Sequence, residues 1–144
     1  MNKSELEGKI REGIPLSEHM DFRVLSLSTN RITVFGRSEQ NQNIHGTAFA
    51  GSLYAIATLA AWGLVQSRLP ANSDLVMATG EINYLKPVVG DIVADCQIDK
   101  DEFETFLSGL KEKGKARLTA ISTIPCEDGN GAEFKGHLYA RLVD

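Results

Sequence analysis

Residues 40–67 carry no Asp, Glu, Lys or Arg, and they read QNQNIHGTAFAGSLYAIATLAAWGLVQS. This is unusual in a chain of which 24% is charged. A helix on a protein surface keeps a polar, mostly charged face toward water, and the apolar part of this segment has no charged face. The segment is therefore either a membrane span or a helix that its own protein encloses.

Its composition favours the enclosed helix. About 18 apolar residues with few charges are enough to span a bilayer. However, small and polar residues interrupt this run, and six of the residues from Ala48 to Ala61 are alanine. Such a segment gains little from insertion into lipid, where Leu, Ile, Phe and Val supply most of the favourable free energy. Small side chains instead let a helix lie close to another backbone, so we expect a core helix and no membrane span.

Length, cysteine content and charge narrow the class of protein. A chain of 144 residues suits one domain, 1–144, with a hydrophobic core of its own. Cys96 and Cys126 are too few for a disulfide framework, and Met1–Arg11 is too charged for a signal peptide, so we expect a cytoplasmic location. The three histidines are scattered, which argues against a metal site. A net charge of −4 argues against a nucleic-acid partner.

Hydrophobic periodicity predicts two strands before the central helix and four after it. The predicted strands cover residues 21–28, 31–37, 75–86, 92–99, 116–124 and 134–143. A short helix is expected over residues 4–12, with Ser4 and Glu7 as a capping box, and Ile14-Pro15 should then start an extended link. Residues 103–113 suit either a short helix or a long hairpin excursion.

Strands that follow one another in hairpins form one antiparallel sheet, which makes this an α+β protein. A helix without a charged face must be wrapped, so this sheet of five to six strands should curl around the one long central helix. A single sheet covers only one side of the helix. The other side needs the short N-terminal helix or, more readily, a second subunit. We therefore expect a homodimer or a larger assembly such as a tetramer.

Two stripes along the central helix differ in their chemistry. An ordinary core stripe consists of Phe49, Leu53, Ile56, Ala60 and Leu64. A second stripe, which carries nearly every hydrogen-bonding side chain of the helix, consists of Gly51, Tyr54, Thr58 and Trp62. Because buried hydroxyls need partners, we expect the second stripe to face polar groups, a cavity or the partner subunit. Alternatively, Thr58 bonds to its own backbone and Tyr54 simply packs.

The N-terminal end of this helix offers a site for negative charge. Its first backbone N–H groups lack intrahelical acceptors and carry the positive end of the helix dipole. Gly46, Ala50 and Gly51 leave this end sterically open. Donors of this kind stabilise a developing oxyanion, as acyl transfer from a thioester requires. Capping and close packing explain the small residues equally well.

Two motifs resemble those of hotdog-fold thioesterases. Residues 43–52, NIHGTAFAGS, are similar to the loop-to-helix segment of these enzymes, whose pattern is Asn-x-x-Gly-Thr-x-His-Gly-Gly. Residues 84–91, YLKPVVGD, are similar to the end of the strand that follows. The segment FAGSLY at 49–54 and the pair Trp62-Gly63 also resemble a thioesterase family that occurs alone or fused C-terminal to an acetyltransferase domain. The likeness covers most of the chain.

This resemblance implies a hotdog fold, a dimeric or higher assembly, and thioesters of coenzyme A or acyl carrier protein as substrates. It implies no cofactor beyond the coenzyme A or carrier phosphopantetheine of the substrate itself. By position, Asn43 would polarise the thioester carbonyl or hold the attacking water, and the backbone N–H of Ala50 or Gly51 would form the oxyanion hole. Asn43 is alternatively a cap or turn residue.

The chain departs from the family pattern in the middle of the helix. Many relatives carry Asp or Glu there as base or nucleophile, whereas the matching residue here is Thr58. Thr58 can position water, His45 is of a residue type that suits a general base, and Glu81 is the nearest strand carboxylate. An ordinary loop histidine and an exposed strand residue are the plainer explanations of the last two. Tyr54, Glu81 and Lys86 are the residues that we expect to contact substrate.

Three functions are compatible with these features. The leading prediction is an acyl-thioester hydrolase that uses a helix-N-terminus oxyanion hole. The missing helix carboxylate favours the alternative, a non-catalytic dimer that binds acyl thioesters. An acetyl or acyl transferase is a third interpretation, because CEDGNGA at 126–132 is close to the Gln/Arg-x-x-Gly-x-Gly/Ala loop of acetyltransferases. A hairpin turn explains that last segment better.

Overall fold

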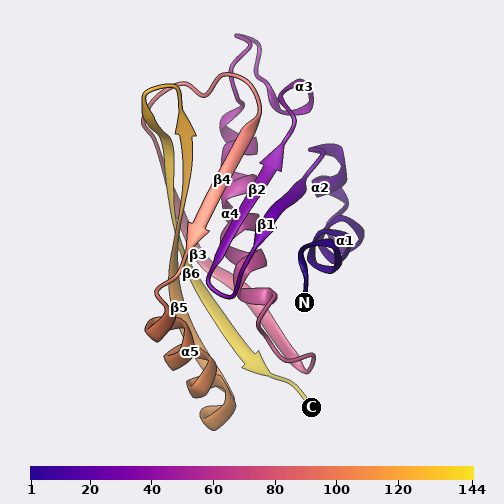
Figure 1. The fold of residues 1–144 in the computed structure, drawn as a ribbon, viewed down its shortest axis with the longest axis vertical. Helices are drawn as coiled ribbons and strands as arrows, with labels where there is room; N and C mark the ends of the chain where they lie inside the picture. Colours follow the sequence, from indigo (N-terminus) through magenta and orange to yellow (C-terminus); the bar gives the residue numbers. More distant parts are fainter.

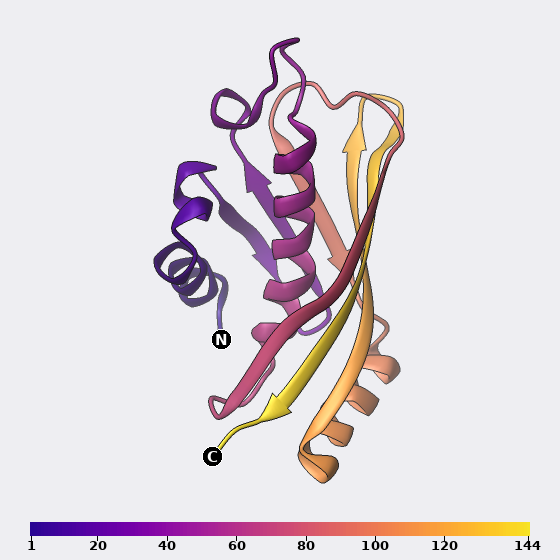
Figure 2. The same ribbon diagram turned by 180° about the vertical axis from the view of Figure 1, so that it is seen from behind.

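Helix α4 (Ala50–Gln66) lies in the hollow of one curled antiparallel sheet (Figures 1 and 2). The computed structural model describes all residues, 1–144. The helix packs against five of the strands, β2 to β6. A helix enclosed in this way needs no charged face, which explains the charge-free sequence. None of the helices combines the length and the apolar content that crossing a membrane requires.

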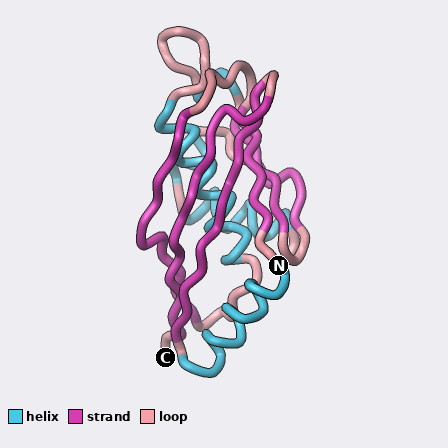
Figure 3. Tube along the Cα trace, turned by 90° about the vertical axis from the view of Figure 1, so that its left-hand side faces the viewer, coloured by secondary structure: helices cyan, strands magenta, loops and turns pink.

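The sheet has six strands in the order β1-β2-β4-β5-β6-β3. Their bounds are Arg23–Leu27 for β1, Arg31–Gly36 for β2, Ser73–Tyr84 for β3, Ile92–Gln97 for β4, Lys115–Cys126 for β5 and Gly129–Leu142 for β6. Strand β3 pairs only with β6, so it forms an edge of the sheet. Figure 3 shows the three long strands β3, β5 and β6 side by side. The predicted α+β class and the curled sheet around one long helix are confirmed.

Four shorter helices complete the chain. They are α1 (Lys3–Gly13), α2 (Pro15–His19), α3 (Ser38–Asn41) and α5 (Lys100–Lys113). The buried side chains Leu6 and Ile10 of α1 reach α4 at Gly63, where an added Cβ would lie 3.4 Å from Ile10 Cδ1. The small residue thus lets α1 approach closely and cover one flank of the C-terminal half of α4.

The other flank of α4 is only partly covered within the chain. Its partly or fully exposed residues are Gly51, Tyr54, Ala55, Thr58, Trp62 and Gln66. The sequence correctly separates this stripe from the core stripe, in which Leu53, Ile56, Ala60 and Leu64 are buried. Phe49 is the exception and is 53% exposed, because it precedes the first turn of the helix and does not share its inward direction. We call this flank the open face of α4.

The sequence predicts the N-terminal helix correctly, but it predicts neither the cap of that helix nor the element after it. The side chain of Asn2 accepts a hydrogen bond from the N–H of Glu5 at 2.9 Å, so the predicted capping box of Ser4 and Glu7 is wrong. Pro15 starts helix α2 where an extended link is expected. A proline fits the first turn of a helix because the N–H that it lacks has no acceptor there.

Residues 103–113 form a helix and not a hairpin excursion. The Asp99 side chain caps α5 and accepts hydrogen bonds from the N–H groups of Asp101 and Glu102, each at 3.1 Å. Gly114 ends the helix with a φ of +78°, which glycine adopts without steric cost.

Candidate functional site

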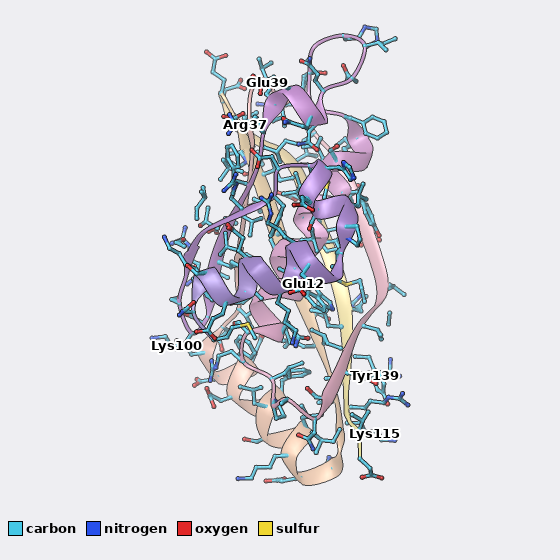
Figure 4. All side chains as sticks on the ribbon, turned by 90° about the vertical axis from the view of Figure 1, so that its right-hand side faces the viewer. Glu12, Arg37, Glu39, Lys100, Lys115 and Tyr139 are labelled. Atoms are coloured by element: carbon cyan, nitrogen blue, oxygen red, sulfur yellow. The ribbon has the colours of Figure 1, made fainter.

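A pocket of about 300 Å³ lies at the N-terminal end of α4. Its lining comprises Asn43, Thr47, Ala48, Ala50, Leu53, Tyr84, Leu85, Lys86, Pro87 and Val88. The loop after α3 and the segment between β3 and β4 meet at this end of the molecule (Figure 1). Arg37 and Glu39 mark the same end in Figure 4, and Lys115 marks the opposite one. The fold therefore brings together the two motifs at 43–52 and 84–91.

The first turn of α4 presents free backbone donors beside this pocket. The first amide with a helical acceptor is that of Leu53, which donates to Phe49 O at 3.0 Å. The N–H groups of Ala50, Gly51 and Ser52 therefore have no acceptor in the chain, and no side chain caps them. The first turn also contains no acidic residue. The positive end of the helix dipole is thus left uncompensated.

Asn43 organises the loop that leads into the helix. Its Oδ1 accepts hydrogen bonds from the N–H groups of His45 and Thr47, at 2.8 and 3.2 Å. Its Nδ2 donates to Thr47 Oγ1 at 2.9 Å and lies 3.5 Å from Ala48 O. These bonds give Asn43 a turn role, which is one of the two roles that the sequence leaves open for it. The Nδ2 hydrogen that points to Ala48 O makes only a long, weak bond, so it is the one amide hydrogen of Asn43 that a ligand in the pocket could accept.

Backbone bonds tie the loop to the second motif. Gly46 has a φ of +81°, a conformation that side chains rarely allow, and its N–H donates to Asn43 O. The N–H of Ala48 donates to Val88 O at 2.8 Å, and that of Phe49 donates to Asn41 O at 2.8 Å. The walls of the pocket are therefore held in a fixed relation by main-chain hydrogen bonds.

Tyr84 forms the wall of the pocket on the β3 side. Its hydroxyl donates to the carbonyl oxygen of Ala50 at 2.9 Å. Burial raises the pKa of the Tyr84 phenol and the nearby Tyr54 raises it further, so the group remains a hydrogen-bond donor at neutral pH. The sequence motif at 84–91 begins with this residue, but nothing in the sequence alone shows that it reaches α4.

Lys86 is held away from the helix. Its Nζ donates to Asp128 O at 2.8 Å and lies 3.3 Å from Asp128 Oδ2, at the turn between β5 and β6. Although Lys86 lines the pocket, its ammonium group already has two partners. Lys86 can thus contact a substrate in one of two ways. Either the methylene groups of its side chain make the contact, or the ammonium group leaves Asp128 and binds the substrate instead.

Comparison with known proteins shows which family shares this sequence and fold. The family model described as "Putative thioesterase (yiiD_Cterm)" matches residues 3–141. The chain belongs to this thioesterase family. In structure it is similar to the "putative thioesterase" of Shewanella oneidensis, at 31% sequence identity over 99% of this chain and 97% of that one, with a TM-score of 0.85.

Two further structures share the fold. A Chlorobaculum tepidum protein of unknown function has 28% identity over 99% of this chain and 94% of its own, with a TM-score of 0.88. A thioesterase of Haemophilus influenzae has only 13% identity, yet it covers 99% of this chain and 92% of its own with a TM-score of 0.77. The predicted family and the predicted hotdog fold are both confirmed.

In this member of the thioesterase family, neither His45 nor Glu81, which could replace the missing helix carboxylate as a base, lines the pocket. His45 is exposed in the projecting loop. Glu81 is exposed on β3 next to Gly80, which faces Tyr54. Because side chains alternate along a strand, Glu81 points to the other face of the sheet, where it is paired in register with Lys135.

Thr58 and Tyr54 belong to the open face of α4, one to two turns beyond the pocket. The Thr58 Oγ1 atom is buried and has no hydrogen-bond partner. The alternative in which Thr58 bonds to its own backbone is therefore wrong. The Tyr54 ring packs edge-on against Phe134, with ring centroids 5.4 Å apart. Of the eight predicted site residues, Asn43, Ala50 and Lys86 line the pocket, and Gly51 follows directly in the first turn.

The pocket lining contains one lysine, one tyrosine, and neither carboxylate nor histidine. Free amides and the Asn43 amide are able to polarise a carbonyl oxygen. A histidine or carboxylate base, the usual means of activating a water molecule, is not supplied by the lining of one chain.

Proposed function

We propose that this protein binds an acyl thioester of coenzyme A or acyl carrier protein at the N-terminal end of α4 and hydrolyses it in the cytoplasm. The observation that carries this proposal is the set of free N–H groups at Ala50, Gly51 and Ser52 beside a pocket without negative charge. Membership of the thioesterase family supports the same chemistry.

In this proposal each part of the pocket has a task. The thioester carbonyl oxygen accepts a hydrogen bond from the N–H of Ala50 or Gly51, and this bond strengthens as the oxygen becomes an oxyanion. The second amide hydrogen of Asn43 orients the carbonyl or the attacking water. Gly51 lets the ring of Phe49 pack against the first turn of the helix, because a Cβ there would collide with this ring. The thiol of coenzyme A or of the carrier phosphopantetheine is the leaving group.

The proposal also includes a homodimer. Strand β3 is an edge of 12 residues with hydrogen-bonded neighbours on one side only, and Val76 on it is 53% exposed. Such an edge is a template for pairing with a second copy. A second subunit on this side would cover the open face of α4. A tetramer is compatible with the same edge contact.

One backbone substitution tests the oxyanion site directly. Ala50→Pro removes a single N–H at the first helical position, where proline is well tolerated. Phe49 has φ −68° and ψ 133°, which is the conformation that a following proline prefers. If the Ala50 N–H is an oxyanion donor, kcat for thiol release should fall by about 10²–10³-fold. The melting temperature should stay within a few degrees of the wild-type value.

Lys100→Pro is the matched control. Lys100 is the first residue of α5, and Asp99 before it has φ −54° and ψ 133°. This variant should keep wild-type kcat. Equal kcat values for Ala50→Pro and wild type would show that the Ala50 N–H is not an oxyanion donor. Failure of the wild type to release thiol from any acyl-coenzyme A or acyl carrier protein would reject hydrolysis.

The absence of a histidine or carboxylate in the pocket lining favours one second candidate, a dimer that binds acyl thioesters without turnover. It predicts binding of S-alkyl-coenzyme A thioethers together with no thiol release. Acetyl transfer has less support. Cys126 pairs with Gly129 across the turn between β5 and β6, so the segment that resembles an acetyltransferase loop is a hairpin followed by a strand.

A further inference from the structure

Two tyrosines fill the space between α4 and the edge strand β3. The Tyr84 hydroxyl is bonded to Ala50 O at 2.9 Å, which joins the end of β3 to the first turn of the helix. One turn further along, the Tyr54 hydroxyl lies against Gly80, where any side chain would collide with it. The pocket lies on one side of this barrier and the rest of the open face of α4, including Thr58, on the other.

The other inner walls of the pocket are also closed. Leu53 is 5% exposed and Val88 is 3% exposed, and both belong to the main core cluster. A chain that enters from solvent beside the first turn of α4 therefore finds no path inward through these two residues. A hydrocarbon that continues along α4 toward Thr58 meets Tyr84, whose hydroxyl is bonded to Ala50 O and whose side chain is half exposed.

The volume limits what fits in front of this barrier. The pocket has a volume of about 300 Å³. It lies at the small end of the range for ligand pockets, which is about 300–1,000 Å³.

We propose that Tyr84, supported by Tyr54, is a specificity-determining gate that restricts this protein to short acyl groups. The inference rests on the proposed thioester site at the α4 N-terminus. With the gate in place, an acyl chain of a few carbons fits between Leu53, Val88 and the Tyr84 ring. A longer chain must displace the ring and break its bond to Ala50, which weakens binding.

The test compares ligands that differ only in chain length. Binding of S-ethyl- and S-octyl-coenzyme A is measured by calorimetry for wild type and Tyr84→Ala. These thioethers are not hydrolysed, so the result does not depend on whether the protein is a hydrolase. Wild type should bind the S-octyl ligand at least about tenfold more weakly than the S-ethyl ligand. Tyr84→Ala should bind the S-octyl ligand as tightly as the S-ethyl ligand, or more tightly.

Two further variants separate the gate from general effects on the fold. Tyr84→Phe keeps the ring but loses the hydroxyl, so it should retain most of the wild-type preference for the short ligand. Tyr139→Ala removes a tyrosine of β6 from the other end of the molecule (Figure 4), where its ring contacts Arg117, and should leave the preference unchanged. Circular dichroism spectra establish that each variant is folded.

Several results would overturn the gate. They are equal or tighter binding of the S-octyl ligand by wild type, an unchanged preference in folded Tyr84→Ala, and no binding of either ligand. The proposed hydrolysis fails separately, if thioesters of every chain length bind and release no thiol. If long-chain thioesters are hydrolysed as fast as short ones, the proposed hydrolysis is supported and the proposed role of Tyr84 as a gate is rejected.

Discussion

The Tyr54 hydroxyl occupies the place where a Cβ on Gly80 would stand. Contact of an aromatic side chain of α4 with the bare backbone of β3 explains why glycine is needed in the middle of this strand. An added Cβ would also lie 3.1 Å from the Phe134 ring, so the neighbours have little room to move. Gly80→Ala should therefore lower the free energy of unfolding by about 1–3 kcal/mol.

Urea unfolding and a double-mutant cycle check this prediction. Tyr54→Phe removes the hydroxyl that the new Cβ meets, so Gly80→Ala should cost at least about 0.5 kcal/mol less in the Tyr54→Phe background. Gly8→Ala in α1 is the matched control, because nothing lies within 4 Å of its Cβ position. That control should stabilise the protein by about 0.5–1 kcal/mol. Full additivity in the cycle would contradict the contact.

Thr58 should be dispensable for the stability of the chain. Its buried hydroxyl has no partner, so Thr58→Val removes an unsatisfied polar group at nearly constant volume. The free energy of unfolding should rise by about 1 kcal/mol. Ser122→Ala offers the contrast, because the buried Ser122 hydroxyl donates to Ala57 O at 2.9 Å, and its loss should cost about 1 kcal/mol. Destabilisation by Thr58→Val would mean that the hydroxyl has a partner.

The edge strand β3 should carry the proposed dimer. Light scattering on wild type is expected to give twice the chain mass of 15.7 kDa or a higher even multiple. Val76→Lys places a charge on this edge and should shift the protein toward monomers. Ile121→Lys is the control, since Ile121 is equally exposed, at 53%, but lies on β5 inside the sheet. A monomeric wild type, or a dimer that Val76→Lys leaves intact, would exclude pairing through β3.

Asp21 should make the fold sensitive to acid. Its carboxylate accepts a hydrogen bond from Arg37 Nε at 2.7 Å and from Arg23 Nη2 at 3.0 Å, and Arg11 lies 3.6 Å away. The hydrogen bond from Arg37 and the nearby Arg23 hold the Asp21 pKa below its ordinary value, against the opposing effect of burial. A lowered pKa in the folded state stabilises the fold above the unfolded pKa, near 4, and this stabilisation is lost as the pH falls.

The Asp21 prediction is checked by urea unfolding between pH 7 and pH 3. Wild type should lose stability over the acidic part of this range, and Asp21→Asn should show a smaller slope. Glu112→Gln is the control, because Glu112 is exposed on α5 and forms no ion pair in the structure. Parallel pH profiles of wild type and Asp21→Asn would contradict the role of this carboxylate.

Much of the candidate site could be predicted because its parts are local in sequence. Ala50 and Gly51 form the start of a helix, and the free amides there follow from helix geometry alone. The bonds of Asn43 within its loop are also local, spanning four residues or five. Tyr84 was missed because its partner, Ala50, is 34 residues away, and no periodic pattern reports a contact at that separation.

The sequence by itself determined the enclosed helix, the two stripes along it and the six strands, because charge and hydrophobic periodicity are properties of short segments. Only the tertiary structure decided that β3 is an edge, that Glu81 points away from the helix and that Lys86 is paired with Asp128. These features depend on which strands pair and in which register, since a shift by one residue turns every side chain to the other face. The uncharged segment thus specifies what must be buried, and the packing of distant strands around it shapes the pocket.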